Sequence, residues 1–195
     1  MAVSPNYPIR SSRLLLRPLD DLDVAALVAY RSLPEVCRYV PFDPMDAAQV
    51  TAHMRGPYGR STFDVEGNAI FIGAALADTK ELVGDVMLRW ASQEHRSGEV
   101  GYVFSPRFSG QGYATEAVHM VLHIGFEDLG LHRIFARVDA RNSASARLAR
   151  RLGMRQEAHL RDNEWFKGGW SDELDFALLE PEWQEQHLGG CSAAP

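Results

Sequence analysis

The sequence is poor in cysteine and has no long hydrophobic run. Both absences exclude classes of protein to which the chain could otherwise belong. Cys37 and Cys191 lie far apart in unlike surroundings, so neither a disulfide framework nor a metal-ligand spacing follows. No apolar stretch is long enough to cross a bilayer, and the N-terminus lacks an apolar signal core. We therefore expect a cytoplasmic protein with no membrane partner. The net charge of -6 argues against nucleic acid as a partner.

Repeats, low-complexity blocks and linkers are also absent, which indicates a single domain. Of the 195 residues, 46% are hydrophobic and 24% are charged, which is ordinary for a soluble protein with one compact core. We expect this domain to span residues 9–186, with flexible termini at 1–8 and 187–195.

The order of the predicted elements indicates a mixed α/β domain with one central sheet. Strands are expected at 13–19, 69–77, 81–90, 99–104, 133–139, 155–161 and 173–179. Helices are expected from about 20 to 31 and at 47–55, 113–129 and 143–152. Asp46 and Asn142 are suitable N-caps for the second and fourth of these helices.

The stretch VGYVFSPRFSGQGYATEA, residues 100–117, is the most informative. An apolar strand runs into Pro106, which cannot donate to a sheet ladder and so leaves the neighbouring strands free to separate. The turn that follows reads Arg107-x-x-Gly110-x-Gly112 and opens a long helix. Orphan N–H groups and the positive end of the helix dipole favour an anion there, and glycines allow close approach of the backbone. The turn predicts a phosphorylated cofactor; a plain loop-to-helix turn is the alternative.

A local basic region follows on an otherwise acidic chain. It contains Arg133, Arg137, Arg141, Arg147, Arg150, Arg151, Arg155 and Arg161. Arg147 and Arg151 lie four residues apart on one face of the predicted helix 143–152, in position for one of them to meet a phosphate of the cofactor. A solvated helix surface is the alternative.

Several motifs in order make the chain resemble the GCN5-related N-acetyltransferases, and within them the branch of ribosomal-protein N-terminal acetyltransferases. The resemblance covers about residues 12–183. Its motifs are RLLLRPL, LVGDV, the R-x-x-G-x-G turn with GYATEA after it, Asn142-x-x-Ser145 followed by Leu152-Gly153-Met154, and a closing D-x5-L-x3-E-W from Asp172 to Trp183.

This resemblance implies a mostly antiparallel central sheet flanked by helices, acetyl-CoA as co-substrate without a metal, and a small-molecule or peptide amine as acceptor. Homodimers are frequent among such relatives. The pyrophosphate would lie on the backbone of the turn from Arg107, with Gly110, Gln111, Gly112, Tyr113, Ala114 and Thr115. The strand ending at Val103 and Phe104 would pair with the pantetheine arm, beside Asn142 and Ser145.

Glu99 is the candidate general base. An alkyl ammonium with a pKa near ~10.4 is mostly protonated at neutral pH, so a base must take a proton directly or through water. An acid often occupies this Glu-x-Gly-Tyr position in the family; an exposed strand carboxylate is the alternative. A strand N–H near Val103 or Phe104 would stabilise the oxyanion.

The chain differs from the family pattern at the residue that would protonate the leaving thiolate. Many relatives carry a tyrosine on the helix after the Asn as general acid, and the matching position here is Ala149. Ser145 is the candidate substitute, with a surface serine as the alternative. A thiol with a pKa near ~8.5 leaves adequately as thiolate, so general-acid catalysis would contribute only modestly to the rate.

Two further features are ambiguous in the sequence. His119 and His123 lie four residues apart, but residue 120 is Met where H-E-x-x-H has Glu, so we expect no metal. The aromatic segment 163–170, with Trp165 and Trp170, would either wall the acceptor channel or cover the sheet.

We therefore expect an N-acetyltransferase that moves the acetyl group of acetyl-CoA to a primary amine by direct attack in a ternary complex. A sensor or regulatory module that binds acyl-CoA without transfer is the alternative, favoured by Ala149 and opposed by Glu99 and Ser145. A transferase for a longer acyl chain, such as succinyl-CoA, is another.

Overall fold

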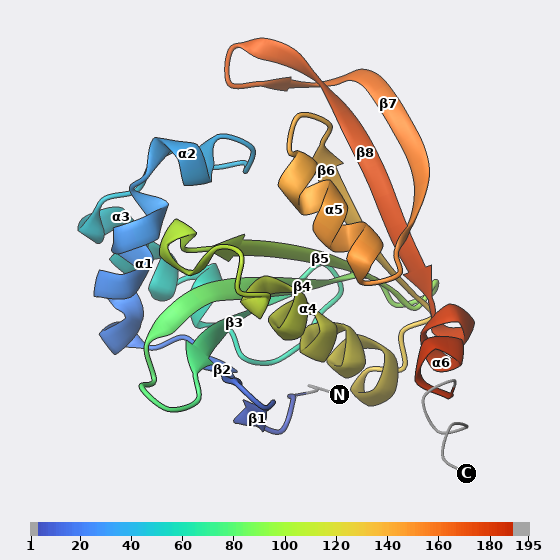
Figure 1. Ribbon diagram of the computed structural model, residues 1–195, viewed down its shortest axis with the longest axis horizontal. Helices are drawn as coiled ribbons and strands as arrows, with labels where there is room; N and C mark the ends of the chain where they lie inside the picture. The colour runs from blue at the N-terminus through green and yellow to red at the C-terminus, as the bar shows by residue number, and fades with distance from the viewer. Residues whose placement is uncertain (1–3, 189–195) are drawn as a thin grey trace.

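One eight-stranded sheet in the order β1-β2-β3-β4-β5-β6-β8-β7 runs through the computed structural model, which describes residues 4–188 (Figure 1). Its strands are β1 (Ile9–Arg10), β2 (Leu14–Pro18), β3 (Ala69–Leu76), β4 (Leu82–Ser92), β5 (Ser97–Phe104), β6 (Arg133–Asp139), β7 (Arg155–Phe166) and β8 (Gly169–Leu179). The α-helices are α1 (Val24–Arg31), α2 (Pro34–Cys37), α3 (Ala47–Met54), α4 (Tyr113–His123), α5 (Ser143–Arg151) and α6 (Glu180–Leu188). The expected mixed, mostly antiparallel sheet is confirmed.

β5 and β6 form the parallel pair in this sheet, and they pair over a short length. The register runs Ser97↔Arg133, Gly98↔Ile134 and Glu99↔Phe135 and then stops. Beyond Glu99, β5 keeps its partner β4 on one side, while its other edge has no strand beside it. The separation begins well before Pro106, so this proline ends the strand but does not cause the separation, contrary to the sequence prediction.

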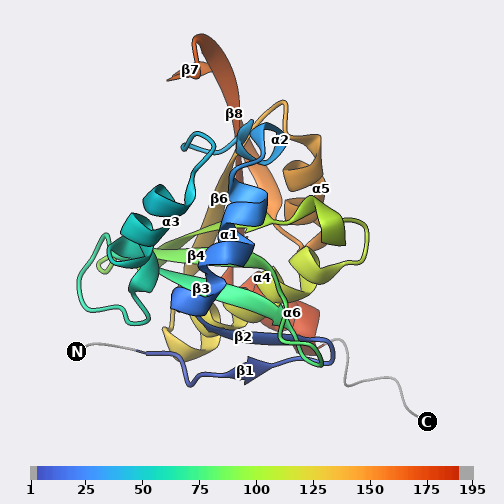
Figure 2. The same cartoon turned by 90° about the vertical axis from the view of Figure 1, so that its left-hand side faces the viewer.

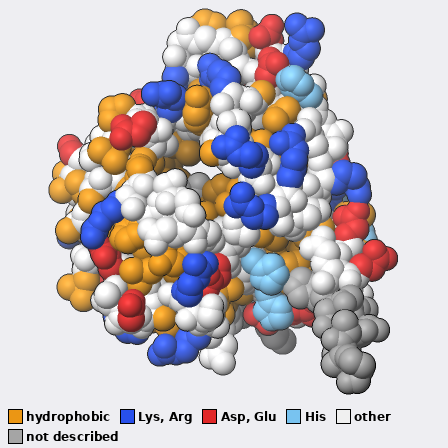
Figure 3. Space-filling view, viewed as in Figure 1, with side chains coloured by type: hydrophobic (Ala, Val, Ile, Leu, Met, Phe, Trp, Pro, Cys, Tyr) orange, Lys and Arg blue, Asp and Glu red, His pale blue; other side chains and the backbone are white. Residues whose placement is uncertain are grey.

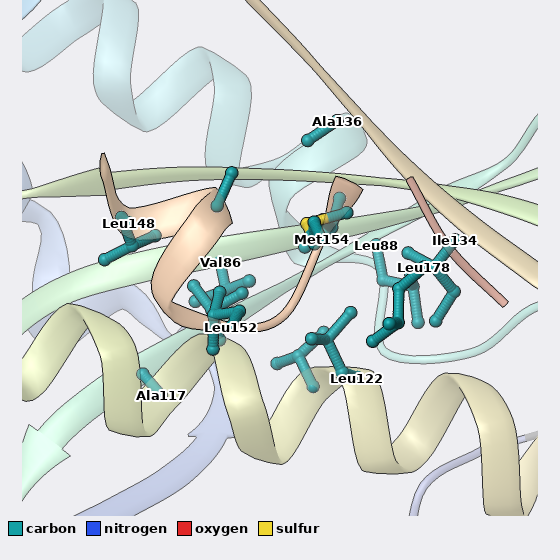
Figure 4. Close-up of a cluster of buried hydrophobic side chains, with 14 of the residues drawn as sticks. Val86, Leu88, Ala117, Leu122, Ile134, Ala136, Leu148, Leu152, Met154 and Leu178 are labelled. Carbon is teal, nitrogen blue, oxygen red and sulfur yellow. The ribbon is translucent and has the colours of Figure 1, made fainter. Parts of the chain in front are cut away.

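Helices cover both faces of the sheet (Figure 2). α4 and α5 pack their apolar sides against one face, where Val86, Leu88, Ala117, Leu122 and Leu152 are buried together (Figure 4). On the other face α1 and α3 form a second, smaller core. Among the described residues, no helix combines the length and apolar character needed to span a membrane.

Two helices begin at the predicted N-caps, Asp46 and Asn142. The helix predicted over 113–129 is not α-helical over its whole length. The Asp46 carboxylate accepts from the Gln49 amide at 2.8 Å, and the Asn142 side chain accepts from the Ser145 amide at 3.1 Å. The helix predicted over 113–129 ends as α-helix at His123 and continues as a π-helical turn, Ile124–Asp128. Close packing on β6 explains the small residue there, because a Cβ at Gly125 would lie 2.4 Å from Ile134.

The two ends of the predicted domain extend further than expected. Tyr7, in a segment predicted to be flexible, packs against the main core. α6 was not predicted, and its Trp183 is 1% exposed and donates to Glu127 at 2.9 Å. Cys191 lies outside the described residues.

β7 and β8 are longer than predicted and include most of the segment expected to connect them. They form a hairpin that turns at Lys167 and Gly168, both with positive φ. Trp165 and Trp170 pack edge to face near its tip and are 64% and 59% exposed. With this exposure they do not cover the sheet.

A buried ion pair joins α1 to β4. Arg31 and Asp85 are 1% and 2% exposed, and Arg31 Nη2 lies 2.6 Å from Asp85 Oδ2. Tyr30 donates to Asp85 at 2.5 Å, and Arg31 donates to the Tyr58 hydroxyl at 2.9 Å. Burial acts to lower the pKa of Arg31, but Asp85, Tyr30 and Tyr58 together outweigh it and raise the pKa, so the guanidinium stays charged.

We expect Asp85→Asn to lower the free energy of unfolding by about 3–5 kcal/mol, because it leaves the buried Arg31 charge without its counter-ion. Urea unfolding measures this change. Glu180→Gln, which removes the half-buried partner of the exposed Arg96 at 3.5 Å, is the control and should cost less than about 1 kcal/mol. Equal losses in the two variants would contradict the role of the buried pair.

Candidate active site

The turn before α4 is an open cradle of backbone donors. Gly110 and Gly112 have φ of +78° and +81°, a conformation that favours glycine. Within the described chain, no protein acceptor takes a hydrogen bond from the N–H groups of residues 110–115. A Cβ at Gly110 would meet nothing within 4 Å, so the space above the turn is free. These donors at a helix N-terminus fit a pyrophosphate.

Arg13, just before β2, braces this turn, and the sequence analysis did not assign it a role. Its guanidinium donates to the Gln111 carbonyl at 2.9 Å, lies 4.8 Å from the Tyr113 ring and pairs with Glu116. Burial acts to raise the pKa of Glu116, but hydrogen bonds from Ser11 and Arg13 outweigh it and hold the pKa below its usual value. The ion pair therefore fixes the first turn of α4.

A groove of about 590 Å³ runs from this cradle between β5 and α5. Figure 3 shows the surface hollowed here, with basic side chains gathered over α5. Most of the predicted cofactor residues line the groove: Val103, Phe104, Gly110, Gly112, Tyr113, Ala114, Thr115, Asn142, Ser145, Arg147 and Arg151.

Two predicted cofactor residues do not line the groove. Arg107 pairs with Glu81 and its side chain is 71% exposed. Gln111 uses its carbonyl for Arg13. Most other arginines of the basic region form ion pairs with acidic side chains, as Arg133 does with Glu157 at 2.6 Å. Of the basic region, Arg147 and Arg151 are the arginines that line the groove.

The free edge of β5 presents alternate backbone amides to the groove. Ser105 donates to the Val83 carbonyl at 2.9 Å, so by alternation Val103 also directs its amide toward β4. Tyr102 and Phe104 direct theirs toward the gap where β6 has separated. An extended chain with amides, such as pantetheine, can pair with such an edge. Of the two amides predicted for the oxyanion, that of Phe104 faces the gap.

A second cavity, of about 300 Å³, lies on the other side of this gap. Besides the residues that it shares with the groove, its lining includes Arg31, Pro41, Phe42, Tyr58, Phe71, Asp85, Met87, Glu99 and Arg137. The shared residues are Val40, Tyr102, Val103, Asn142 and Ser145. Groove and cavity therefore meet at the open stretch of β5.

Tyr102 and Ser145 stand at this meeting point, and Tyr102 was missed by the sequence analysis. The two hydroxyl oxygens are 2.8 Å apart, and the Tyr102 hydroxyl lies 3.2 Å from the Ser145 carbonyl. Burial raises the pKa of Tyr102 to about 12, although the hydrogen bond with Ser145 acts to lower it. The phenol therefore stays neutral at physiological pH. Tyr102 is the tyrosine of the Glu-x-Gly-Tyr sequence. Its role was not predicted, because its partner Ser145 lies 43 residues further along the chain.

Glu99 occupies the fork where β5 and β6 separate. Arg89 donates to its Oε2 through Nε at 2.8 Å and through Nη2, while Arg137 donates to its Oε1 at 3.0 Å. A carboxylate offers about four lone-pair sites, so these three bonds leave one site on Oε1. The Glu99 side chain is 12% exposed and lines the cavity.

An acidic pocket of about 180 Å³ adjoins the cavity and shares Pro41, Glu99 and Arg137 with it. Its walls include Glu164 and Glu173. Burial raises the pKa of Glu173 although Arg137 acts to lower it, and the nearby Glu164 adds to the rise. In the described part of the chain, no group of three or more His, Cys, Asp and Glu residues is arranged to hold a metal.

Comparisons with known proteins assign the family. The model of the acetyltransferase (GNAT) domain matches residues 13–155. YnaD of Bacillus subtilis (strain 168), an uncharacterized N-acetyltransferase, is 32% identical over 183 residues, which cover 90% of this chain and 98% of YnaD. The crystal structure of a GNAT-family acetyltransferase from Bacillus anthracis matches with a TM-score of 0.80 at 28% identity, covering 93% of this chain and 100% of that one.

The chain therefore belongs to the GNAT acetyltransferases and is an acyltransferase enzyme, as the sequence motifs predicted. Members of this family use acetyl-CoA as co-substrate. The alternative of a module without transferase activity is not supported by these relatives.

Two further relatives carry an acceptor in their names. YdaF of Bacillus subtilis (strain 168) is provisionally named a ribosomal N-acetyltransferase and is 30% identical over 113 residues, covering 58% of this chain and 62% of YdaF. Spermidine N(1)-acetyltransferase of Escherichia coli (strain K12) is 26% identical over 107 residues, covering 55% of this chain and 58% of that protein.

We expect Gly112→Val to weaken the binding of coenzyme A by about tenfold or more, because a β-branched residue cannot hold the positive φ that opens the cradle. Isothermal titration calorimetry measures the affinity. Gly67→Val is the matched control: Gly67 has a φ of +88° and lines neither the groove nor the cavity. The cradle is misassigned if Gly112→Val binds coenzyme A as well as this control does.

Proposed function

We propose that the protein is an acetyl-CoA-dependent N-acetyltransferase that acts on a primary amine by direct attack in a ternary complex. The observation that carries this proposal is the meeting of groove and cavity at the unpaired stretch of β5. A donor in the groove and an acceptor in the cavity would reach each other from opposite sides of one strand, without a covalent enzyme intermediate.

The groove supplies the contacts that coenzyme A requires. The amides of residues 110–115 would bind the pyrophosphate, and Arg147 or Arg151 would meet a phosphate. The open edge of β5 at Tyr102 would pair with the pantetheine arm. When bound, acetyl-CoA supplies an activated acetyl thioester.

Glu99 would hold the acceptor and take its proton, directly or through water. The two carboxylates that line the cavity are Asp85 and Glu99. Asp85 is 2% exposed and paired with the equally buried Arg31, whereas the Glu99 side chain is 12% exposed and retains one lone-pair site on Oε1. An ammonium or water at that site would donate to Oε1 and pass its proton to it.

Tyr102 and Ser145 would stabilise charge as the thiol leaves. When Tyr102 donates its O–H to Ser145 Oγ, the serine hydroxyl is free to donate toward the groove. A phenol with a pKa of about 12 is too weak an acid to protonate a thiolate with a pKa near ~8.5, so the pair would act as hydrogen-bond donors. The Phe104 amide would donate to the acetyl oxygen.

We expect Glu99→Gln to slow acetyl transfer by roughly 100-fold while coenzyme A affinity stays nearly unchanged, because a general base contributes about that factor. Free-thiol release with an amine panel measures the rate at each pH. Glu164→Gln, a carboxamide in the adjoining pocket, should keep the wild-type rate. A Glu99→Gln variant with wild-type rates at every pH excludes Glu99 as the base.

We expect Tyr102→Phe and Ser145→Ala each to lower kcat by about tenfold without weakening coenzyme A binding, since the second removes the hydrogen bond to developing charge and the first removes the bond that orients it. The double variant should lose little more than either single one. Because the phenol stays protonated below its raised pKa, its titration should remove no wild-type activity up to about pH 10. Additive losses in the double variant would show that the residues act separately.

A further inference from the structure

Lys167, at the tip of the β7–β8 hairpin, reaches a segment that lies about 130 residues away in the chain. Its ammonium donates to the Cys37 carbonyl at 2.6 Å and to the Phe42 carbonyl at 2.7 Å, and lies 3.4 Å from an Asp43 oxygen. Two of the three donors of this ammonium are therefore taken by carbonyls of residues 37–43, and the Asp43 carboxylate lies at ion-pair distance. In Figure 1 the tip of the hairpin bends toward α2, where this segment begins.

The segment that Lys167 holds is one side of the acceptor cavity. Val40, Pro41 and Phe42 line that cavity, and Pro41 also lines the acidic pocket next to it. Residues 38–46 form neither helix nor strand, so no ladder of backbone hydrogen bonds holds them in place. Contacts from elsewhere in the fold must therefore set the position of this wall.

The hairpin tip is a suitable anchor because its own conformation is tight. Lys167 and Gly168 form the two-residue turn with φ of +49° and +86°, and Trp165 packs edge to face on Trp170 across it. A hydrogen bond from a charged donor is stronger than a neutral one, and both acceptors of Lys167 are carbonyls. The contact thus joins the C-terminal hairpin to the N-terminal half of the chain.

We propose that Lys167 latches residues 37–43 over the acceptor cavity and thereby restricts the acceptor to a small primary amine. This inference rests on the proposed function. With the latch closed the cavity measures about 300 Å³. That volume is at the low end of the range of about 300–1,000 Å³ that is typical of small-molecule sites. A polypeptide N-terminus would require the 37–43 wall to move away from Lys167.

The test compares the full-length wild type with Lys167→Met, Lys167→Arg and Lys80→Met. Lys80→Met is a matched control, because Lys80 also lies at a hairpin turn with positive φ and donates to a carbonyl, but its acceptor Ala77 lines neither cavity nor groove. One readout is amide hydrogen exchange of residues 37–45. The other is kcat/KM for 2-phenylethylamine relative to a hexapeptide with a free N-terminus.

In Lys167→Met we expect amide exchange in residues 37–45 to quicken by about tenfold, as for the loss of hydrogen bonds from a charged donor. The preference for the small amine over the hexapeptide should fall by a similar factor. Lys167→Arg and Lys80→Met should retain both properties, and coenzyme A affinity should be equal in all four proteins.

Unchanged exchange in Lys167→Met would overturn the latch. A wild type that acetylates the hexapeptide better than the small amine would overturn the size restriction while leaving the proposed function intact. A wild type that binds coenzyme A but acetylates neither amine would overturn the proposed function, and the exchange measurement would still decide the latch.

Discussion

The loss of pairing between β5 and β6 after Glu99 is the constraint on which the site depends. Where a sheet edge opens inside a domain, its amides must find partners other than the neighbouring strand. Here the open edge lies between a groove with a basic rim and a smaller cavity with paired charges. The same short stretch of β5 thus serves both compartments, which lets two substrates meet at one strand.

Ion pairs hold the elements around this opening in place. Arg13 and Glu116 fix the start of α4, Arg31 and Asp85 join α1 to β4, and Glu99 ties Arg89 of β4 to Arg137 of β6. Each pair joins different elements, so these charges fix the geometry of the gap as well as making it polar. The π-helical turn after α4 and the buried Trp183 complete the support behind the groove.

Local patterns in the sequence predicted much of the fold and of the cofactor groove, because strands, N-caps and the glycine turn are set by neighbouring residues. Asn142 and Gly112 are such cases. The features that were missed depend on partners far along the chain: Arg13 and Gln111 are 98 residues apart, Tyr102 and Ser145 are 43 apart, and Lys167 and Cys37 are 130 apart. Periodicity and capping carry no information about such pairs. The separation of β5 from β6 was wrongly attributed to Pro106, since it begins after Glu99.

Amide hydrogen exchange with and without coenzyme A tests the central claim most directly. The account predicts that coenzyme A slows exchange at Tyr102, at Phe104 and across residues 110–115, while the Val103 amide, already bonded within the sheet, changes little. Binding of coenzyme A that protects a different surface and leaves these amides exchanging at their free rate would contradict it.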